Sequence, residues 1–346
     1  MQSRPNFFIV GAPKCGTTSL YESLRQHPQV FMPYDRQHYW LAKEPGYFCS
    51  ELIARPNLAV NGQHEYLKLF AGASGQPRIG EASSLYLYSL LAAERIQRFC
   101  PTAKIIIMVR EPVAMMLSWH ADNLRHGHED VLSFEQAIAL EEPRWRGESL
   151  PRGAGYPACL QYRRMATFSD QIERYQQRFE RQQIKVLLLE DFADDPQATL
   201  ASVLEFLELP TDCQLDWGVH NPRTRLSEGD LRQHQVKNWL RKFGAVRLAR
   251  RLLPVDFSSV LRVLLRPWLS HREIPVLSSP EFLAELRQQM RPEVERLAEV
   301  IDRDLSHWML PIPGPPAGSV PSPHFIVNRP LDSGREQRTP PPQPRK

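Results

Sequence analysis

The chain has 346 residues and a net charge of +4 at pH 7, from 43 lysines and arginines against 39 aspartates and glutamates. This length allows one large domain with a substantial core and leaves little room for two. A charge so close to balance does not indicate nucleic-acid binding, and we expect no nucleic-acid partner. The five cysteines are scattered without metal-ligand spacing, which favours a reducing compartment.

The first residues do not read as a secretory leader. A strand-like run begins by Phe7, which leaves no room for a charged region followed by an apolar region of ~7–15 residues. No uncharged apolar stretch approaches the ~18 residues that a membrane-spanning helix needs. From these two observations we expect a cytoplasmic protein.

The first predicted elements are a strand over residues 7–10 and a helix from about Thr18, joined by a glycine-rich loop. The loop reads Gly11-Ala12-Pro13-Lys14-Cys15-Gly16-Thr17-Thr18-Ser19. Its glycines have the spacing of the nucleotide triphosphatase loop G-x-x-x-x-G-K-[ST], but Thr17 takes the place of the lysine and Lys14 lies inside the loop. Backbone N–H groups and the helix N-terminus can still bind a phosphate-type anion. The pattern predicts an anion site in which Lys14 reaches a leaving-group oxygen; the alternative is an ordinary strand-to-helix turn with a surface lysine.

A second buried strand is predicted over residues 104–109, and Arg110 follows it directly. A magnesium-dependent phosphotransferase would have a metal-binding aspartate at the end of such a strand. Arginine at the carboxyl end of a parallel strand instead predicts a second anionic group, and we expect no metal. Ser118 comes about two helical turns later, where its hydroxyl would complete an arginine clamp on a phosphate. The alternative for Arg110 is a solvated charge at a strand end.

Strands and helices alternate along the rest of the first 310 residues. This alternation predicts an α/β fold, a P-loop-like three-layer α/β/α architecture with a central parallel sheet. Glu190-Asp191 closes the third strand, and we favour pairing or helix capping over metal binding for this acidic pair. The further predicted elements are a strand over residues 185–189, helices over 133–142, 169–182 and 196–207, and a last helix pair from 280 to about 308.

Two segments near the C-terminus differ in composition. Residues 236–275 alternate between basic and apolar. Three interpretations fit this pattern: peripheral contact with an anionic membrane, a cap that binds an acceptor substrate, or an ordinary helix with one face in the core. Prolines recur with glycine, serine and arginine in residues 311–346, which is typical of a disordered tail. We therefore expect one domain over residues 1–310, with the basic segment inside it, followed by the tail.

Four motifs in order resemble the sulfotransferases that use 3′-phosphoadenosine 5′-phosphosulfate (PAPS), especially the heparan-type carbohydrate branch and its bacterial relatives. The resemblance covers about residues 6–308. Residues 13–20 are similar to the 5′-phosphosulfate loop, 110–118 to the 3′-phosphate motif, 43–48 (Lys-Glu-Pro-Gly-Tyr-Phe) to the segment that faces the sulfate, and 80–87 to the stretch with the catalytic glutamate. The segment over residues 34–41 is longer than is usual in the family, which predicts a reshaped acceptor entrance.

The resemblance implies transfer of a sulfuryl group from PAPS to a hydroxyl or amine of a carbohydrate or lipid-linked acceptor. In this reaction negative charge grows on the bridging oxygen and a proton leaves the acceptor, so a cation and a carboxylate are needed on opposite sides. Lys14 is the candidate for the leaving oxygen and Lys43 for the sulfuryl oxygens or the same bridge. Glu81 is the candidate base, with His120 as the alternative, and Glu44 is expected to orient Lys43.

The resemblance also implies a set of donor-binding residues. They are Lys14, Cys15, Gly16, Thr17, Thr18, Ser19, Arg110, Ser118 and, from a late cationic loop over the nucleotide, Arg223. Met115 departs from the pattern because the family often has a further arginine there. Two other functions stay open: a P-loop kinase, which would depend on magnesium, and a non-catalytic nucleotide-binding protein, which would not consume the donor.

Overall fold

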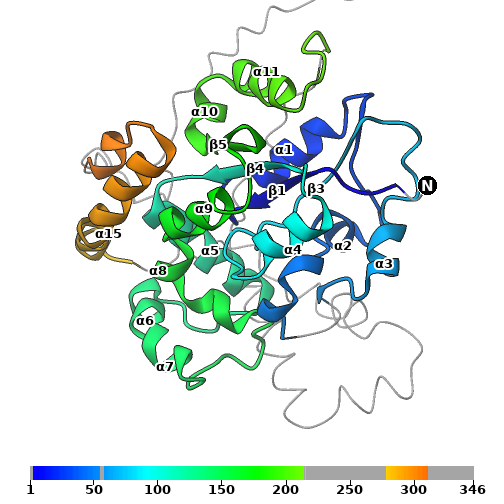
Figure 1. The fold of residues 1–346 in the computed structure, drawn as a ribbon. Helices are drawn as coiled ribbons and strands as arrows, with labels where there is room; N and C mark the ends of the chain where they lie inside the picture. Colours follow the sequence, from blue (N-terminus) through cyan, green and yellow to red (C-terminus); the bar gives the residue numbers. More distant parts are fainter. Residues whose placement is uncertain (1–2, 55–57, 214, 216–277, 311–346) are drawn as a thin grey trace, which may run out of the picture. The chain divides into compact units, whose positions relative to one another are not determined.

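A parallel β-sheet forms the centre of the structure, a computed structural model that describes residues 3–54, 58–213, 215 and 278–310 (Figure 1). Its strands are β1 (Phe7–Gly11), β2 (Val30–Phe31), β3 (Arg78–Glu81), β4 (Lys104–Val109) and β5 (Ile184–Leu188), in the spatial order β2-β3-β1-β4-β5. All four strand pairs are parallel. Every residue of β1, and all of β4 after Lys104, is buried, as expected for strands covered on both faces.

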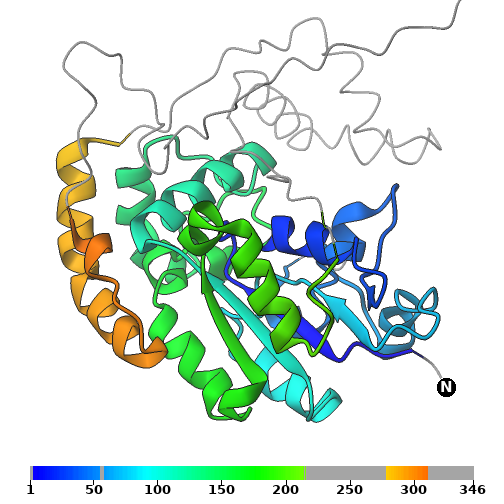
Figure 2. The same cartoon turned by 90° about the horizontal axis from the view of Figure 1, so that it is seen from above.

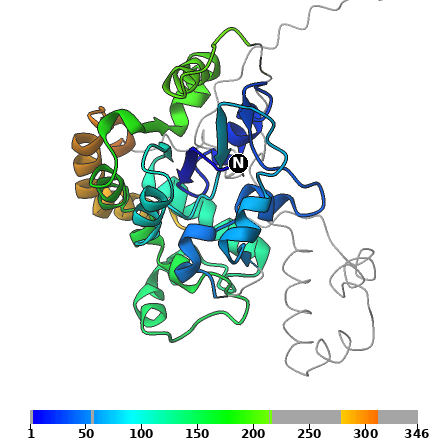
Figure 3. The ribbon, with the colours of Figure 1, turned by 45° about the vertical axis from the view of Figure 1, so that its right-hand side comes forward.

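Helices cover both faces of the sheet, so the predicted three-layer α/β architecture is confirmed (Figures 1 and 2). The longest helix, α15, packs against α5 and α9 on one side of the domain, while α2 and α3 lie on the opposite side (Figures 1 and 3). The helices are α1 (Thr17–Leu24), α2 (Tyr39–Lys43), α3 (Gln63–Lys68), α4 (Ala92–Phe99), α5 (Pro112–His126), α6 (Phe134–Ala139), α7 (Glu141–Trp145), α8 (Tyr162–Met165), α9 (Phe168–Gln176), α10 (Leu189–Asp194), α11 (Pro196–Phe206) and α15 (Pro280–Ile301). Short 3₁₀ turns are η1 (Tyr47–Leu52), η3 (Pro157–Leu160), η4 (Arg181–Gln183) and η6 (Ser306–Met309).

Most predicted elements agree with the structure, and the differences have local causes. The predicted helix over residues 133–142 is two short helices, α6 and α7, and α9 ends at Gln176 rather than residue 182. The predicted last pair is the single helix α15, which continues through Pro292, followed by η6. No helix follows β3 directly: residues 84–88 form turns, and α4 begins at Ala92.

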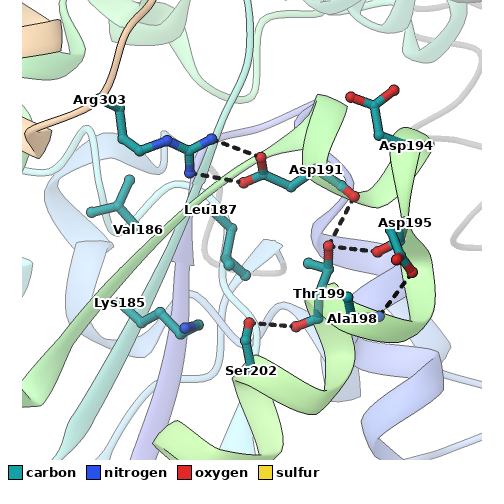
Figure 4. Close-up of a pocket in the computed structure, with 10 residues that line it drawn as sticks. All are labelled: Lys185, Val186, Leu187, Asp191, Asp194, Asp195, Ala198, Thr199, Ser202 and Arg303. Carbon is teal, nitrogen blue, oxygen red and sulfur yellow. Dashed lines mark hydrogen bonds and ion pairs between the residues drawn. The ribbon is translucent and has the colours of Figure 1, made fainter.

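Asp191, the second residue of the acidic pair after β5, has the capping and pairing role that the sequence predicted for the pair. Asp191 accepts a hydrogen bond from the Leu188 amide (2.9 Å), and its carboxylate receives two hydrogen bonds from Arg303 (2.9 and 3.3 Å). Figure 4 shows this ion pair at the rim of a pocket of about 400 Å³ between β5, α10 and α11. Arg303 thereby ties the segment after α15 to the end of β5.

Several predictions fall on other parts of the chain. Arg223, the basic segment over residues 236–275 and the tail over 311–346 lie outside the described residues. Among the residues that are described, no helix combines the length and apolar character needed to cross a bilayer.

Candidate active site

The candidate site lies at the edge of the sheet where the strands end. Because all strands are parallel, their carboxyl ends point to this edge: Gly11 ends β1 and Arg110 follows β4, while Glu81 ends the shorter strand β3. β3 and β4 flank β1 on its two sides, so β2 and β3 lie to one side of β1 and β4 and β5 to the other, which makes the end of β1 a topological switch point. This is where open α/β sheets bind their ligands.

The loop after β1 has the backbone conformation of an anion cradle. Gly11 has a φ of 148°, and a Cβ there would lie 2.6 Å from the Ser84 carbonyl oxygen, so only glycine permits this close approach. Gly16 precedes α1 with a φ of 91° and offers no side chain to cap the helix. In the first turn of α1 the amides of Thr17 and Thr18 have no intrahelical acceptor and can donate to an anion; that they bind one stays a prediction.

Lys14 projects from this loop toward α5. Its Nζ lies 2.9 Å from Oδ1 of Asp122, and both side chains are largely covered, with exposed fractions of 17 and 20%. Arg110 holds the same loop from the other side, because its Nη1 donates to the Lys14 carbonyl oxygen at 3.1 Å. The structure thus brings together the two predicted cations and an aspartate that sequence reasoning missed.

Asp122 is anionic at neutral pH. Burial alone would raise the pKa of its carboxyl, but the hydrogen bond from His126 and the Lys14 ammonium outweigh burial and hold the pKa well below its usual range. The Asp122 hydrogen bond in turn raises the pKa of His126. A helical spacing could have found Asp122, because it lies four residues after Ser118 and so on the same face of α5.

The other two predicted residues of α5 have different surroundings. Ser118 shares the face of Asp122 and is half-buried; its clamp with Arg110 stays a prediction. His120 lies two positions further, so it points elsewhere: its ring packs against Phe134 and Tyr162 (centroids 5.4 and 5.7 Å apart), and its Nε2 lies 2.9 Å from the Val131 carbonyl oxygen. Burial lowers the pKa of His120, which keeps the ring neutral. These contacts describe a histidine of the core.

Glu81 is fully buried, although it ends a strand at the site edge. In the parallel register it pairs with Phe8, three residues before the end of β1, which places it about 10 Å deeper in the sheet than Gly11. The Tyr66 hydroxyl donates to its Oε2 at 2.5 Å. Burial raises the pKa of Glu81 to about 7, although the hydroxyls of Tyr66, Ser83 and Tyr86 partly stabilise the carboxylate.

Glu44 is the more accessible carboxylate at this edge. Its side chain is 31% exposed, and its Oε1 lies 2.5 Å from Nζ of Lys43, whose side chain is fully buried. Its Oε2 accepts a hydrogen bond from Ser84 Oγ at 2.9 Å. Since the Ser84 backbone touches Gly11, a single serine links the Glu44 carboxylate to the start of the anion-binding loop.

The remaining loop residue with reactive chemistry is Cys15. It is fully buried, and burial raises the pKa of its thiol to about 12. A thiol in this state is not a nucleophile at neutral pH. Cys15 therefore contributes its backbone and its small size to the loop.

Comparisons with known proteins show the family of the chain. A family model described as a sulfotransferase domain matches residues 4–242. Carbohydrate sulfotransferase 15 of Mus musculus is 28% identical over 251 residues, which cover 59% of this chain and 44% of that protein. Bifunctional heparan sulfate N-deacetylase/N-sulfotransferase 4 of Mus musculus is 25% identical over 207 residues, covering 59% of this chain and 22% of that protein. The chain thus spans less than half the length of these curated relatives.

One solved structure is similar along nearly its whole length. The crystal structure of a sulfotransferase from Alicyclobacillus acidocaldarius superimposes with a TM-score of 0.62 at 29% identity, covering 88% of this chain and 99% of that one.

Proposed function

Because the chain belongs to the sulfotransferase family, we propose that it transfers a sulfuryl group from PAPS to a hydroxyl or amine of a carbohydrate or lipid-linked acceptor. The observation that carries this proposal is that two cations and a separate carboxylate lie around the loop after β1. Lys14 and Arg110 supply the positive charge, and Glu44 supplies a carboxylate that accepts a hydrogen bond from Ser84, whose backbone lies against Gly11. In-line sulfuryl transfer needs positive charge at the leaving oxygen and a carboxylate at the attacking side.

The loop after β1, together with Arg110, is the proposed binding site of the donor. Its uncapped helix N-terminus and Lys14 suit the 5′-phosphosulfate, and Arg110 with Ser118 suits the 3′-phosphate. During transfer the acceptor oxygen forms a bond to sulfur while the bond from sulfur to the phosphate oxygen breaks, and that oxygen keeps the electron pair. Lys14 stabilises the charge that develops there, once its ammonium has left Asp122 for the donor.

We propose that the Glu44 carboxylate is the general base that accepts the proton from the acceptor. A carboxylate has about four acceptor sites, so Glu44 keeps room for an acceptor hydroxyl while it binds Lys43 and Ser84. Lys43 then orients Glu44, the reverse of the sequence-based expectation. Glu81, the base expected from sequence, is enclosed with Tyr66 and would need the sheet edge to open before an acceptor reached it. The contact of Lys43 with the sulfuryl oxygens stays a prediction.

A matched pair of variants tests the base. We expect Glu44→Gln to lower kcat by about 10²–10⁴-fold, the usual contribution of general base catalysis, and Glu81→Gln to keep kcat within about threefold of the wild type. Affinity for 3′,5′-adenosine bisphosphate should stay unchanged in both variants. The opposite result, a silent Glu44→Gln and an inactive Glu81→Gln, would return the role of base to Glu81.

Transfer itself is tested with labelled sulfate. The purified chain is incubated with PAPS labelled in its sulfate and a panel of carbohydrate, lipid and phenolic acceptors, with Lys14→Ala as the inactive control. We expect label in a carbohydrate or lipid-linked acceptor without added magnesium. Phosphate transfer from ATP that requires magnesium, with no sulfate transfer, would favour the kinase alternative, and bound but unconsumed PAPS would favour a binding protein. A cytoplasmic location and the absence of a metal remain predictions.

A further inference from the structure

An exposed aromatic cluster lies on the segment between β2 and Lys43. It consists of Tyr34, Tyr39 and Trp40, which we call the aromatic platform. The Tyr34 and Tyr39 rings meet edge to face with centroids 6.1 Å apart, and the Tyr39 and Trp40 rings do so at 5.1 Å. Tyr34 is 53% exposed and Trp40 is 55% exposed. Tyr34 and Trp40 thus flank the half-buried Tyr39, and a contiguous exposed aromatic surface of this kind is a candidate binding site.

The platform is held rigidly by helix α1. The Tyr39 hydroxyl donates to Oε1 of Glu22 at 2.6 Å, and the Tyr39 ring packs edge to face on buried Tyr21 at 6.3 Å. The guanidinium of Arg25, also from α1, lies over the Tyr34 ring at 4.0 Å from its centroid. These contacts fix the Tyr39 ring, against which Trp40 packs, and one face of Tyr34, so a ligand need not order these two tyrosines when it binds.

The platform adjoins the proposed catalytic carboxylate. The Glu44 amide donates to the Trp40 carbonyl oxygen at 2.8 Å, which makes the two residues neighbours across one helical turn, about 6 Å along the axis. α2 ends at Lys43, the partner of Glu44. The exposed Trp40 and the group that receives the acceptor proton are thus four residues apart, one on α2 and the other at its C-cap.

We propose that the aromatic platform is an acceptor subsite for an oligosaccharide, with one sugar ring stacked on Trp40 and the adjoining ring presenting its hydroxyl or amine to Glu44. This inference rests on the proposed sulfuryl transfer. A flat aromatic face suits the C–H face of a pyranose, and the same segment carries exposed polar residues, among them Asp35 and His38, which pair with each other at 3.2 Å. An acceptor of at least two sugar units follows, since a single ring cannot occupy both positions.

The test compares Trp40→Ala with a matched control, Trp145→Ala. Trp145 is equally exposed, at 54%, but it lies on α7, which Figure 1 shows at the lower left, away from α2 at the right. Its ring packs under the Arg164 guanidinium at 3.9 Å. Acceptors are a desulfated heparan sulfate tetrasaccharide, a chondroitin tetrasaccharide and free glucosamine.

We expect Trp40→Ala to raise KM for a tetrasaccharide acceptor about tenfold, and Trp40→Phe to raise it less, because phenylalanine keeps an aromatic face. Affinity for 3′,5′-adenosine bisphosphate and the KM for glucosamine should not change, and Trp145→Ala should behave as the wild type. An unchanged tetrasaccharide KM in Trp40→Ala would overturn the inference. The subsite would also be ruled out if the wild type sulfated lipid or phenolic acceptors but neither tetrasaccharide; the proposed sulfuryl transfer would then still stand. Failure of the wild type to bind 3′,5′-adenosine bisphosphate would instead refute the proposed function.

Discussion

Replacement of Glu81 by glutamine should stabilise the protein at alkaline pH. Glu81 is fully buried, and its pKa is raised from 4.5 to about 7, chiefly because burial disfavours the charged form. The folded state therefore holds the Glu81 proton more tightly than the unfolded state. This contribution to stability is complete below about pH 4.5, declines as the pH rises and is lost above about pH 7. Two and a half pKa units correspond to about 3 kcal/mol.

Glutamine at this position does not ionise, and its carbonyl oxygen can still accept the Tyr66 hydrogen bond. The free energy of unfolding is measured by urea titration for the wild type and Glu81→Gln at pH 5 and pH 8. Going from pH 5 to pH 8, we expect the variant to gain about 2.5 kcal/mol relative to the wild type, with an unchanged m value. Exposed Glu65→Gln serves as the control and should show no comparable gain. If the free energies of unfolding of Glu81→Gln and the wild type differ by the same amount at pH 5 and pH 8, the raised pKa of buried Glu81 is refuted.

Three further variants test other contacts. Arg110→Ala should weaken binding of 3′,5′-adenosine bisphosphate by about 10–100-fold in calorimetry, because charge-assisted hydrogen bonds to the phosphate are lost; unaltered affinity would contradict the clamp. Asp122→Asn should tighten binding of the same ligand about tenfold, since the donor no longer competes with a carboxylate 2.9 Å from Lys14; equal or weaker binding would show that Asp122 assists the donor. Glu129→Gln should lower the free energy of unfolding by about 3–5 kcal/mol, because it leaves the fully buried Arg144 without its anionic partner; a loss below 1 kcal/mol in urea titration would contradict this.

The parts of the site that follow one another in sequence could be predicted. β1 and β4 are continuous apolar runs, and the spacing of Gly11 and Gly16 with Lys14 between them indicates an anion loop. Arg110 follows its strand directly, so its place at the sheet edge follows from the parallel architecture alone. These features depend on local chemistry and on one general rule of α/β sheets.

The parts that depend on register and on long-range contacts could not be predicted. β3 is four residues long and reads Arg-Ile-Gly-Glu, which carries no strand signal. Only its pairing with Phe8 shows that Glu81 lies below the site edge. The link from Gly11 through Ser84 to Glu44 joins three separate segments of the chain, and the pairing of Lys14 with Asp122 spans 108 residues. Helical spacing puts Asp122 on the same face of α5 as Ser118, but sequence patterns do not show which distant side chain such a residue contacts.

The proposed function requires that a bisphosphorylated adenosine bind across the loop after β1 and the end of β4. This binding is measured by titration calorimetry of the wild-type chain with 3′,5′-adenosine bisphosphate, and separately with ATP and magnesium. We expect saturable heat with the bisphosphate, reduced in Arg110→Ala, and weaker binding of ATP. Tight binding of magnesium-ATP with no heat from the bisphosphate would contradict it.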